Sequence, residues 1–487
     1  MTSFVICHLS FESPASHLPN TTNQKELQDD KKALFSCLSV NKIWCEIIIP
    51  LLWKNPWKYL KKGKEKLLLN VIFSHLTEKS KDLNQFFDFF IESYQKPLFN
   101  YINFCKYLNL IEIIKMINSI IINDKSKILI LQKEIFHIFI NPYTKFTHLY
   151  IPYRFNYEIH LIPGAKNCLS ELQFLSCNTS VNDNIITGLM GICNSIREIE
   201  LSMLSNEKIN SSYGIVKLIE AQKKLLSVHF LANYQRINES ICEVFENSLI
   251  KHAKSIQYFE TTKQPITKFL SYFINLKRLE LNDNFVYMAW NNLEDISLPS
   301  LQILKARSVP IKVLASLIEN TSGYLTEIKI DRIRHDVINN KRIIQSIYLN
   351  CPMLKYLKLL FINSNFLELE NLLIRCQYLK GLYIIFEDVW VSYVMIDWNH
   401  LFEILTKSSP TGLFKFKFYY NGVPKLESLK LFFDNWKSRN PMLLQTTQMC
   451  KSEYTDLIES YKSQGIIKKF NDNLYAFDDF EWIQKAF

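Results

Sequence analysis

A six-residue pattern with large apolar residues at its first, fourth and sixth positions recurs through the chain from residue 169 onward, with Thr261 and Ala306 as departures at the sixth position. It reads LSELQF at 169, IREIEL at 196, LLSVHF at 225, IQYFET at 256, LKRLEL at 276, LQILKA at 301, LTEIKI at 325, LKYLKL at 354, LKGLYI at 379 and LFKFKF at 413. Such hexads also arise by chance in a chain that is 48% hydrophobic. The evidence for a structural repeat is therefore their spacing. Successive starts are 20 to 34 residues apart, close to the period of about 20–29 residues that one short strand plus one helix occupies.

Most intervals between hexads also contain an apolar run with helical spacing, such as IKVLASLIENTSGY or FLELENLLIRCQ. This predicts an α/β fold, a solenoid with short parallel strands on its concave face and helices outside. Cysteines mark the turns before the hexads, since Cys193, Cys351 and Cys376 lie three residues before one and Cys168 lies one before. That placement resembles the cysteine-containing leucine-rich repeats. We expect these four thiols to pack in the core rather than to serve redox or metal chemistry.

Alternation along a strand predicts that the first, fourth and sixth hexad residues are buried and that the fifth is exposed on the concave face. The fifth residues are Gln173, Glu200, His229, Glu260, Glu280, Lys305, Lys329, Lys358, Tyr383 and Lys417. We predict that the fifth residues from Glu200 to Lys417 bind a target protein. The glutamates precede the lysines, which suggests the hypothesis that the concave face orients a charge-segregated partner.

The segment 29–57 reads DDKKALFSCLSVNKIWCEIIIPLLWKNPW, with apolar residues three and four apart. Two short amphipathic helices are predicted, the first capped by Asp29 or Asp30 and the second ended or kinked at Pro50. Three of the 8 tryptophans of the chain fall here, at 44, 53 and 57. Such a cluster indicates a small core or a partner interface.

This segment resembles an F-box, especially in the form that the large F-box families of filamentous and mycorrhizal fungi take. The residues at the motif positions are Leu18, Pro19, Leu34, Leu38, Val40, Trp44, Leu52 and Trp53. The resemblance implies that these residues bind a Skp-type adaptor and join the chain to a cullin-based SCF ubiquitin ligase. The repeats downstream would then bind a target protein.

An alternative stays open. Between Pro19 and Asp29 the sequence NTTNQKELQ has Leu27 as its only large apolar residue, whereas the family has an apolar first helix there. In the alternative, a relic F-box packs against the rest of the chain, and the repeats form a protein-binding scaffold with no ligase role.

Sequence signatures of catalysis are missing. The 10 glycines form neither GxGxxG nor GxxxxGK, no two histidines lie within eight residues of each other, and there is no CxxC. We therefore expect no enzyme activity, no cofactor and no metal site. No helix-turn-helix, zinc finger or RNA-recognition motif accompanies the net charge of +10, so nucleic acid is not the expected partner.

The odd count of 11 cysteines and the lack of a signal peptide at residues 2–10 predict reduced thiols and a cytoplasmic or nuclear location. The sequence contains no uninterrupted apolar run of 18 residues, so we expect no membrane span. The expected organisation is a mobile N-terminus at 1–28, F-box-like helices at 29–60, a helical linker or degenerate repeats at 61–163, leucine-rich repeats at 164–440 and a helical cap at 441–487.

Overall fold

The computed structural model of the chain describes residues 31–75, 97–121, 124–203, 213–232, 238–283, 290–332, 336–386, 396–420, 424–447 and 452–474. The chain divides into two compact units, one of residues 1–202 and 207–224 and one of residues 203–206 and 225–487. Strand order in the 14-stranded sheet follows sequence order from β1 to β14. Within each unit, neighbouring strands pair in parallel. The predicted α/β, solenoid-like architecture is confirmed.

The first unit begins with helices and continues with four strands, the last of which ends at its boundary. Its elements are α2 (Lys31–Cys37), α3 (Lys42–Trp53), η2 (Pro56–Tyr59), α4 (Glu65–Phe73), α6 (Tyr101–Phe104), β1 (Tyr107–Asn109), α7 (Leu110–Ile120), α8 (Lys125–Phe139), β2 (His148–Tyr150), η4 (Ile159–Leu161), α9 (Ala165–Cys168), β3 (Phe174–Asn178), α10 (Asp183–Ile192), β4 (Glu198–Met203) and α11 (Tyr213–Ala221).

The second unit repeats a strand followed by a helix or a 3-10 turn. Its elements are β5 (Ser227–Ala232), α12 (Glu239–Ile250), β6 (Tyr258–Thr261), η6 (Phe269–Tyr272), β7 (Arg278–Asn282), η7 (Asn291–Leu293), β8 (Ile303–Arg307), α13 (Ile311–Glu319), β9 (Glu327–Asp331), α14 (Val337–Asn350), β10 (Tyr356–Phe361), η8 (Asn363–Asn365), α15 (Phe366–Arg375), β11 (Gly381–Phe386), α16 (Trp398–Ser408), β12 (Lys415–Tyr419), α17 (Leu426–Asn435), β13 (Met442–Thr446), α18 (Ser452–Ser463) and β14 (Ile467–Asn471).

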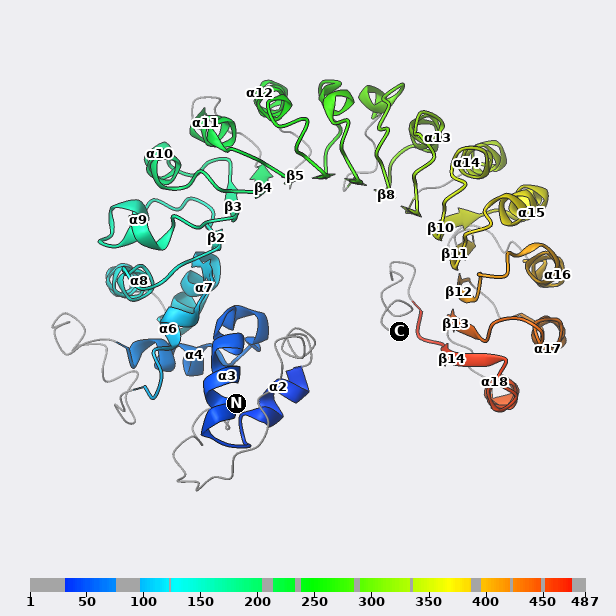
Figure 1. Cartoon of the computed structure of the whole chain (residues 1–487), viewed down its shortest axis with the longest axis horizontal. Helices are drawn as coiled ribbons and strands as arrows, with labels where there is room; N and C mark the ends of the chain where they lie inside the picture. Colours follow the sequence, from blue (N-terminus) through cyan, green and yellow to red (C-terminus); the bar gives the residue numbers. More distant parts are fainter. Residues whose placement is uncertain are drawn as a thin grey trace. The chain divides into compact units, whose positions relative to one another are not determined.

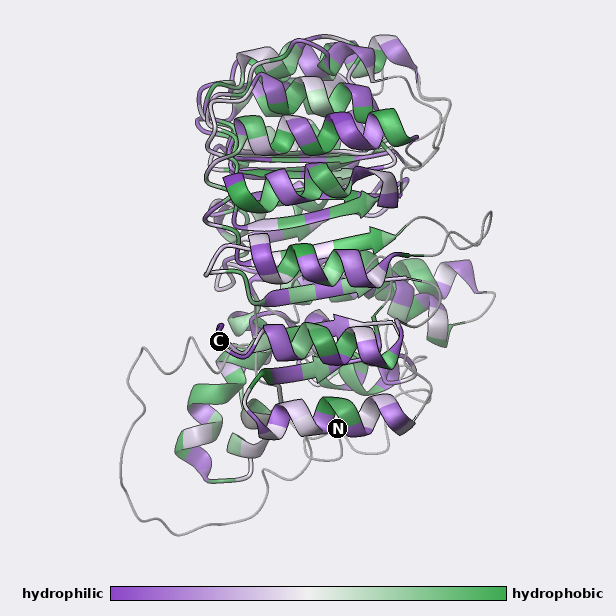
Figure 2. Cartoon of the chain, turned by 90° about the vertical axis from the view of Figure 1, so that its right-hand side faces the viewer, coloured by the Kyte–Doolittle hydropathy of each residue, from purple (hydrophilic) through white to green (hydrophobic). Residues whose placement is uncertain are grey.

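Within each unit the helices that join successive strands from β2 onward lie on one side of the strands (Figure 1), because parallel neighbours must be joined by a crossover. The core lies between the two layers. Fourth and sixth hexad residues such as Leu279 and Leu281 are fully buried, and each helix turns an apolar stripe toward them. In α15 that stripe is Phe366, Leu369 and Leu372, and hydrophobic and hydrophilic residues alternate in this way along the helices (Figure 2).

Cysteines close the helix-to-strand turns, as predicted. Cys193 and Cys376 directly follow α10 and α15, and their backbone N–H groups bond to the carbonyls of Leu189 and Leu372. The Cys193 thiol also bonds to the carbonyl of Leu169 in the preceding repeat, at 3.1 Å. A small, fully buried thiol thus ties one repeat to the next.

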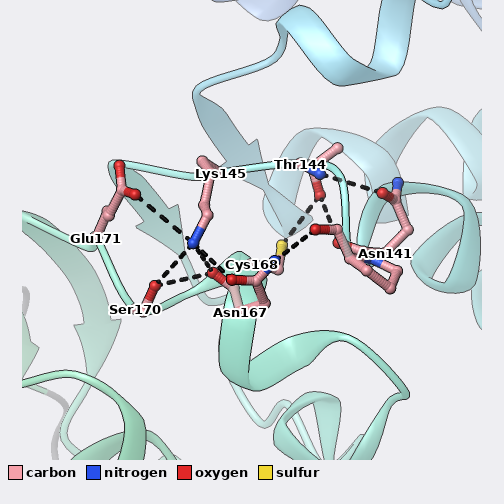
Figure 3. A network of polar contacts seen from close by, with 8 residues as sticks. Asn141, Thr144, Lys145, Asn167, Cys168, Ser170 and Glu171 are labelled. Atoms are coloured by element: carbon pink, nitrogen blue, oxygen red, sulfur yellow. Dashed lines mark hydrogen bonds and ion pairs between the residues drawn. The ribbon is translucent and has the colours of Figure 1, made fainter.

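Figure 3 shows one such junction in the first unit. The Lys145 ammonium donates to the Asn167 side chain at 2.7 Å and to the Asn167 carbonyl at 2.9 Å. It also lies 3.6 Å from the Glu171 carboxylate. Beneath it, the Thr144 hydroxyl and the Cys168 thiol are buried together, 3.2 Å apart. Polar groups at the rim and a thiol in the interior hold the two turns together.

The first hexad lies three residues later than expected. Ser176 is the residue that pairs with Glu200 of β4 and Tyr150 of β2, whereas Gln173 precedes β3. The repeating unit is therefore LQFLSC from Leu172, not LSELQF from residue 169. Apolar residues at 169, 172 and 175 fit either frame, and only pairing with the neighbouring strands selects one.

The sheet also extends beyond the range 164–440 that the hexads indicate. Strands β1 and β2 precede it, and β13 and β14 follow it. The tail segment expected to be one helix is α18 followed by β14, so it adds a further repeat. Among the described residues, two intervals inside the range hold the 3-10 turns η6 and η7 in place of helices. Interval length does not decide this, because intervals of 24 and 25 residues elsewhere hold the helices α13 and α15.

Candidate functional site

The N-terminal helices α2 and α3 form as predicted. Asn41 caps α3, its side-chain oxygen accepting from the Trp44 backbone N–H at 3.0 Å. Pro50 does not end the helix, which continues to Trp53. The last turn survives the missing N–H because Leu52 and Trp53 are buried there, at 4% and 2% exposure. The predicted capping residues Asp29 and Asp30 lie outside the described residues.

The predicted adaptor-binding residues separate into two groups. Leu34, Leu52 and Trp53 are buried inside the first unit, whereas Leu38 and Trp44 are half-buried. Val40 is 55% exposed, and its neighbour Ile43 is 50% exposed. Leu18 and Pro19 lie outside the described residues. We call Leu38, Val40, Ile43 and Trp44 the α2–α3 patch, a group of apolar residues of this segment that are not buried.

Behind that patch, tryptophans fasten the segment to the beginning of the sheet. The Trp57 indole N–H donates to the backbone carbonyl of Tyr107 in β1 at 2.8 Å. The Trp53 ring lies 4.8 Å from the Tyr101 ring, centroid to centroid. The Lys54 carbonyl accepts from the Lys106 N–H at 2.9 Å. The helices therefore cover the first strand, as an end cap of a repeat array must.

In the second unit, the sheet face opposite the helices carries paired charges on β5–β8. His229 Nδ1 lies 2.8 Å from the Glu260 carboxylate, which also accepts from the Tyr258 hydroxyl at 3.0 Å. The hydrogen bond with His229 lowers the pKa of Glu260. Glu280 accepts from Arg278 Nε at 2.6 Å and lies 3.3 Å from Lys305 Nζ. All five of these charged side chains are half-buried.

On β9–β12 the prediction of exposed fifth residues is wrong. Lys329, Lys358, Tyr383 and Lys417 are all buried, with 6%, 1%, 0% and 0% exposure. Lys329 and Lys358 pair with Glu327 and Asp331 at 2.8 and 2.7 Å. Lys358 and Lys417 also flank the Tyr383 ring, at 4.6 and 5.7 Å from its centroid. Neighbouring acids and aromatic rings make burial of these ammonium groups possible.

A residue after β14 helps to close this face. Leu474 is buried in one cluster with Tyr383 and Leu443, and partly buried rings such as Tyr356 and Phe414 pack against the cluster. The Leu474 N–H bonds to the Thr446 carbonyl at 3.1 Å. The chain itself therefore occupies part of the β11–β13 face, and β5–β8 is the more open part of the predicted target surface.

Charge segregation along this face is weaker than the fifth positions suggested. Lys329 and Lys358 are neutralised by Glu327 and Asp331, which lie at other positions of the same face. Within the first unit, Glu200 accepts a hydrogen bond from Ser176 at 2.7 Å. Third-position residues, which the hexad analysis did not consider, supply partners such as Arg278 and Glu327. Period-two alternation was the signal that would have identified them, since third and fifth residues face the same side.

Burial raises the pKa of the Cys193 and Cys376 thiols to about 12, which makes them poor nucleophiles and ligands. Among the described residues, no cluster of three or more His, Cys, Asp or Glu is arranged to hold a metal ion. In the same part of the chain, none of the helices has the length and apolar character needed to cross a bilayer. Neither protein-family models nor curated proteins give a match to this sequence.

Proposed function

We propose that the chain is a non-catalytic receptor of an SCF-type ubiquitin ligase. In this proposal the F-box-like segment binds a Skp-type adaptor through the α2–α3 patch, and the strand face of the second unit holds a target protein. Ubiquitin transfer would belong to the other ligase subunits. The proposal places the chain in the cytoplasm or nucleus, where thiols stay reduced.

The exposed α2–α3 patch is the observation that carries this proposal. Val40 and Ile43 are about half exposed, at 55% and 50%, whereas Leu34 of α2 and Ile48, Leu52 and Trp53 of α3 are buried. Exposed apolar side chains beside a half-buried tryptophan are typical of a protein interface. The buried Leu34, Leu52 and Trp53 would then support the patch rather than touch the adaptor.

The scaffold alternative is favoured by a different observation, the Trp57–Tyr107 hydrogen bond. That bond gives the N-terminal helices a structural role as an end cap, and such a role needs no adaptor. The repeats would still bind a partner protein through the face of β5–β8.

Co-purification with a Skp-type adaptor tests the proposal. The wild-type chain should retain the adaptor, and the double variant Val40→Asp/Ile43→Asp should lose it while keeping the wild-type melting temperature. Leu67→Asp is the matched control, because Leu67 lies on α4 of the same unit and is 44% exposed. Failure of the wild-type chain to retain the adaptor would leave only the scaffold alternative.

A further inference from the structure

The first unit carries a row of aromatic rings on the face of its strands opposite the helices. In the parallel register, Tyr107, His148, Phe174 and Glu198 lie side by side on β1–β4. Two residues further along, Asn109, Tyr150, Ser176 and Glu200 form the adjacent row. Both rows face the same way, since strand residues alternate, and neither is part of the α2–α3 patch.

The rings are in contact. The Tyr107 and His148 centroids are 3.8 Å apart and nearly parallel, and those of His148 and Phe174 are 5.4 Å apart. Tyr150 lies 5.0 Å from Phe174. Tyr107, His148 and Tyr150 are only half-buried, so this aromatic platform reaches solvent.

Carboxylates border the platform at its β4 end. Glu198 and Glu200 are half-buried there, and the Ser176 hydroxyl orients Glu200 by a 2.7 Å hydrogen bond. Burial raises the pKa of Tyr150 to about 12, and the negative charges of Glu200 and Glu198 contribute to that shift. Toward the other end, the positive charges of Lys54 and Lys58 act to lower the pKa values of His148 and Tyr107, against Glu198, which acts to raise both. The β4 end is therefore the more attractive one for a cation.

We propose that this platform binds an arginine side chain of an extended, basic peptide segment. A guanidinium stacks on aromatic faces and pairs with a carboxylate in the same plane, which matches the half-buried Tyr150 ring, supported by the buried Phe174, and the nearby Glu200. A nucleic acid would stack on the rings too, but its phosphates would be repelled by the two glutamates. The inference rests on the proposed function, because it names the chemistry of a segment of the target protein.

The test measures fluorescence anisotropy with the full chain and a labelled peptide, GSRGSRGS. A second peptide carries citrulline, which is neutral and of the same shape, in place of each arginine. We expect saturable binding of the first peptide and at least tenfold weaker binding of the second. Tyr150→Leu and Glu200→Gln should each weaken binding of the arginine peptide about tenfold, whereas Tyr150→Phe keeps the ring and should bind like wild type.

Glu171→Gln is the control, because Glu171 lies in the same unit, outside the platform, with a side chain 59% exposed. It should leave the affinity unchanged. Equal affinity for the citrulline peptide, no binding of the arginine peptide, or an unaltered affinity in Tyr150→Leu would overturn the inference. So would tighter binding of a labelled oligothymidylate that Tyr150→Leu removes. Adaptor co-purification is independent of this platform, so its outcome distinguishes failure of the inference from failure of the proposed function.

Discussion

At the scale of single residues, the buried lysines of β9–β12 depart furthest from expectation. A fifth-position lysine looks like a solvated surface residue in the sequence, and its hexad gives no sign of the acid that buries it. The partner of Lys358 is Asp331, on the preceding strand and two residues beyond the aligned Lys329. Only the register of β9 against β10 brings the two together, so the sequence alone could not predict this pair.

Replacing Lys358 by alanine should lower the free energy of unfolding by about 3 kcal/mol, because the change leaves Asp331 without its ammonium partner. Lys305→Ala is the matched change on the same face. It should lower the free energy by less than about 1 kcal/mol, because its side chain is 25% exposed. Urea unfolding of both variants checks the difference, and equal losses would contradict the pairing described for Lys358. The charge reversal Lys305→Glu is therefore a cleaner probe of target binding than a reversal of Lys358, because it should disturb the fold less.

The Glu260–His229 pair predicts a dependence of stability on pH. The pKa of Glu260 is lowered in the folded chain, so the unfolded state binds a proton more readily. The resulting stabilisation is fully present above the ordinary value of 4.5 and is lost as the pH falls through the lower, folded pKa. Glu260→Gln should therefore be less stable than wild type at pH 7, with a smaller difference at pH 3. The urea midpoints of wild type and Glu260→Gln at the two pH values measure this change. The same difference between the two proteins at both pH values would show that the Glu260–His229 pair is not the source of the pH dependence.

At the scale of elements, the sequence predicts the strands better than their connections. Nine of the ten hexads fall in register with their neighbours, because apolar residues at fixed offsets specify a strand with one buried face. The first hexad was placed three residues too early because two candidate frames, from residue 169 and from residue 172, share apolar residues. The connections are less predictable, because intervals of the same 25 residues hold the 3-10 turn η7 in one repeat and the helix α15 in another. The helix α10 shows a further constraint that no hexad reveals, its close approach to His160.

Gly188 in α10 provides a test of that approach. A Cβ at residue 188 would overlap the His160 ring of η4, whereas a Cβ at Gly191, one turn later, meets nothing within 4 Å. Gly188→Ala should therefore destabilise the chain by about 1–3 kcal/mol through overpacking. Gly191→Ala should be neutral or stabilising by up to about 1 kcal/mol, because alanine is the better helix former. Thermal unfolding of the two single variants measures this difference in stability. Equal melting temperatures would show that η4 moves to accommodate the added methyl group without loss of stability.

At the scale of the whole molecule, the α/β class, the parallel strands and the order of repeats were predictable, since all three follow from one recurrent pattern. The extent of the array was not. Strands β1, β2, β13 and β14 lie outside the hexad series, and the fastening of α3 and η2 onto β1 depends on Trp57 and a backbone carbonyl far along the chain. The candidate surfaces were predicted only in part, because exposure depends on what other parts of the chain cover.

Leu474 makes the covering of the β11–β13 face testable. Leu474→Ser should detach this residue from Tyr383 and Leu443 and increase amide hydrogen exchange in β13 and β14. The first unit should exchange as in wild type, since each repeat contacts mainly its neighbours. Leu431→Ser is the control, because Leu431 on α17 is 55% exposed and the change should alter exchange little. Unchanged protection of β13 and β14 would show that Leu474 does not hold this face closed.

The constant register of the strands bears on how such a chain can evolve. From β5 to β13 each strand pairs residue for residue with the next, whereas the intervals between the hexads of the chain vary from 20 to 34 residues. We therefore expect the chain to tolerate changes of length between strands within about this range, and duplication or loss of a whole repeat to preserve the remaining pairings. A single-residue deletion inside a hexad would instead turn the buried residues of that strand outward. Natural variation should accumulate in the lengths of the connections, while the hexads keep theirs.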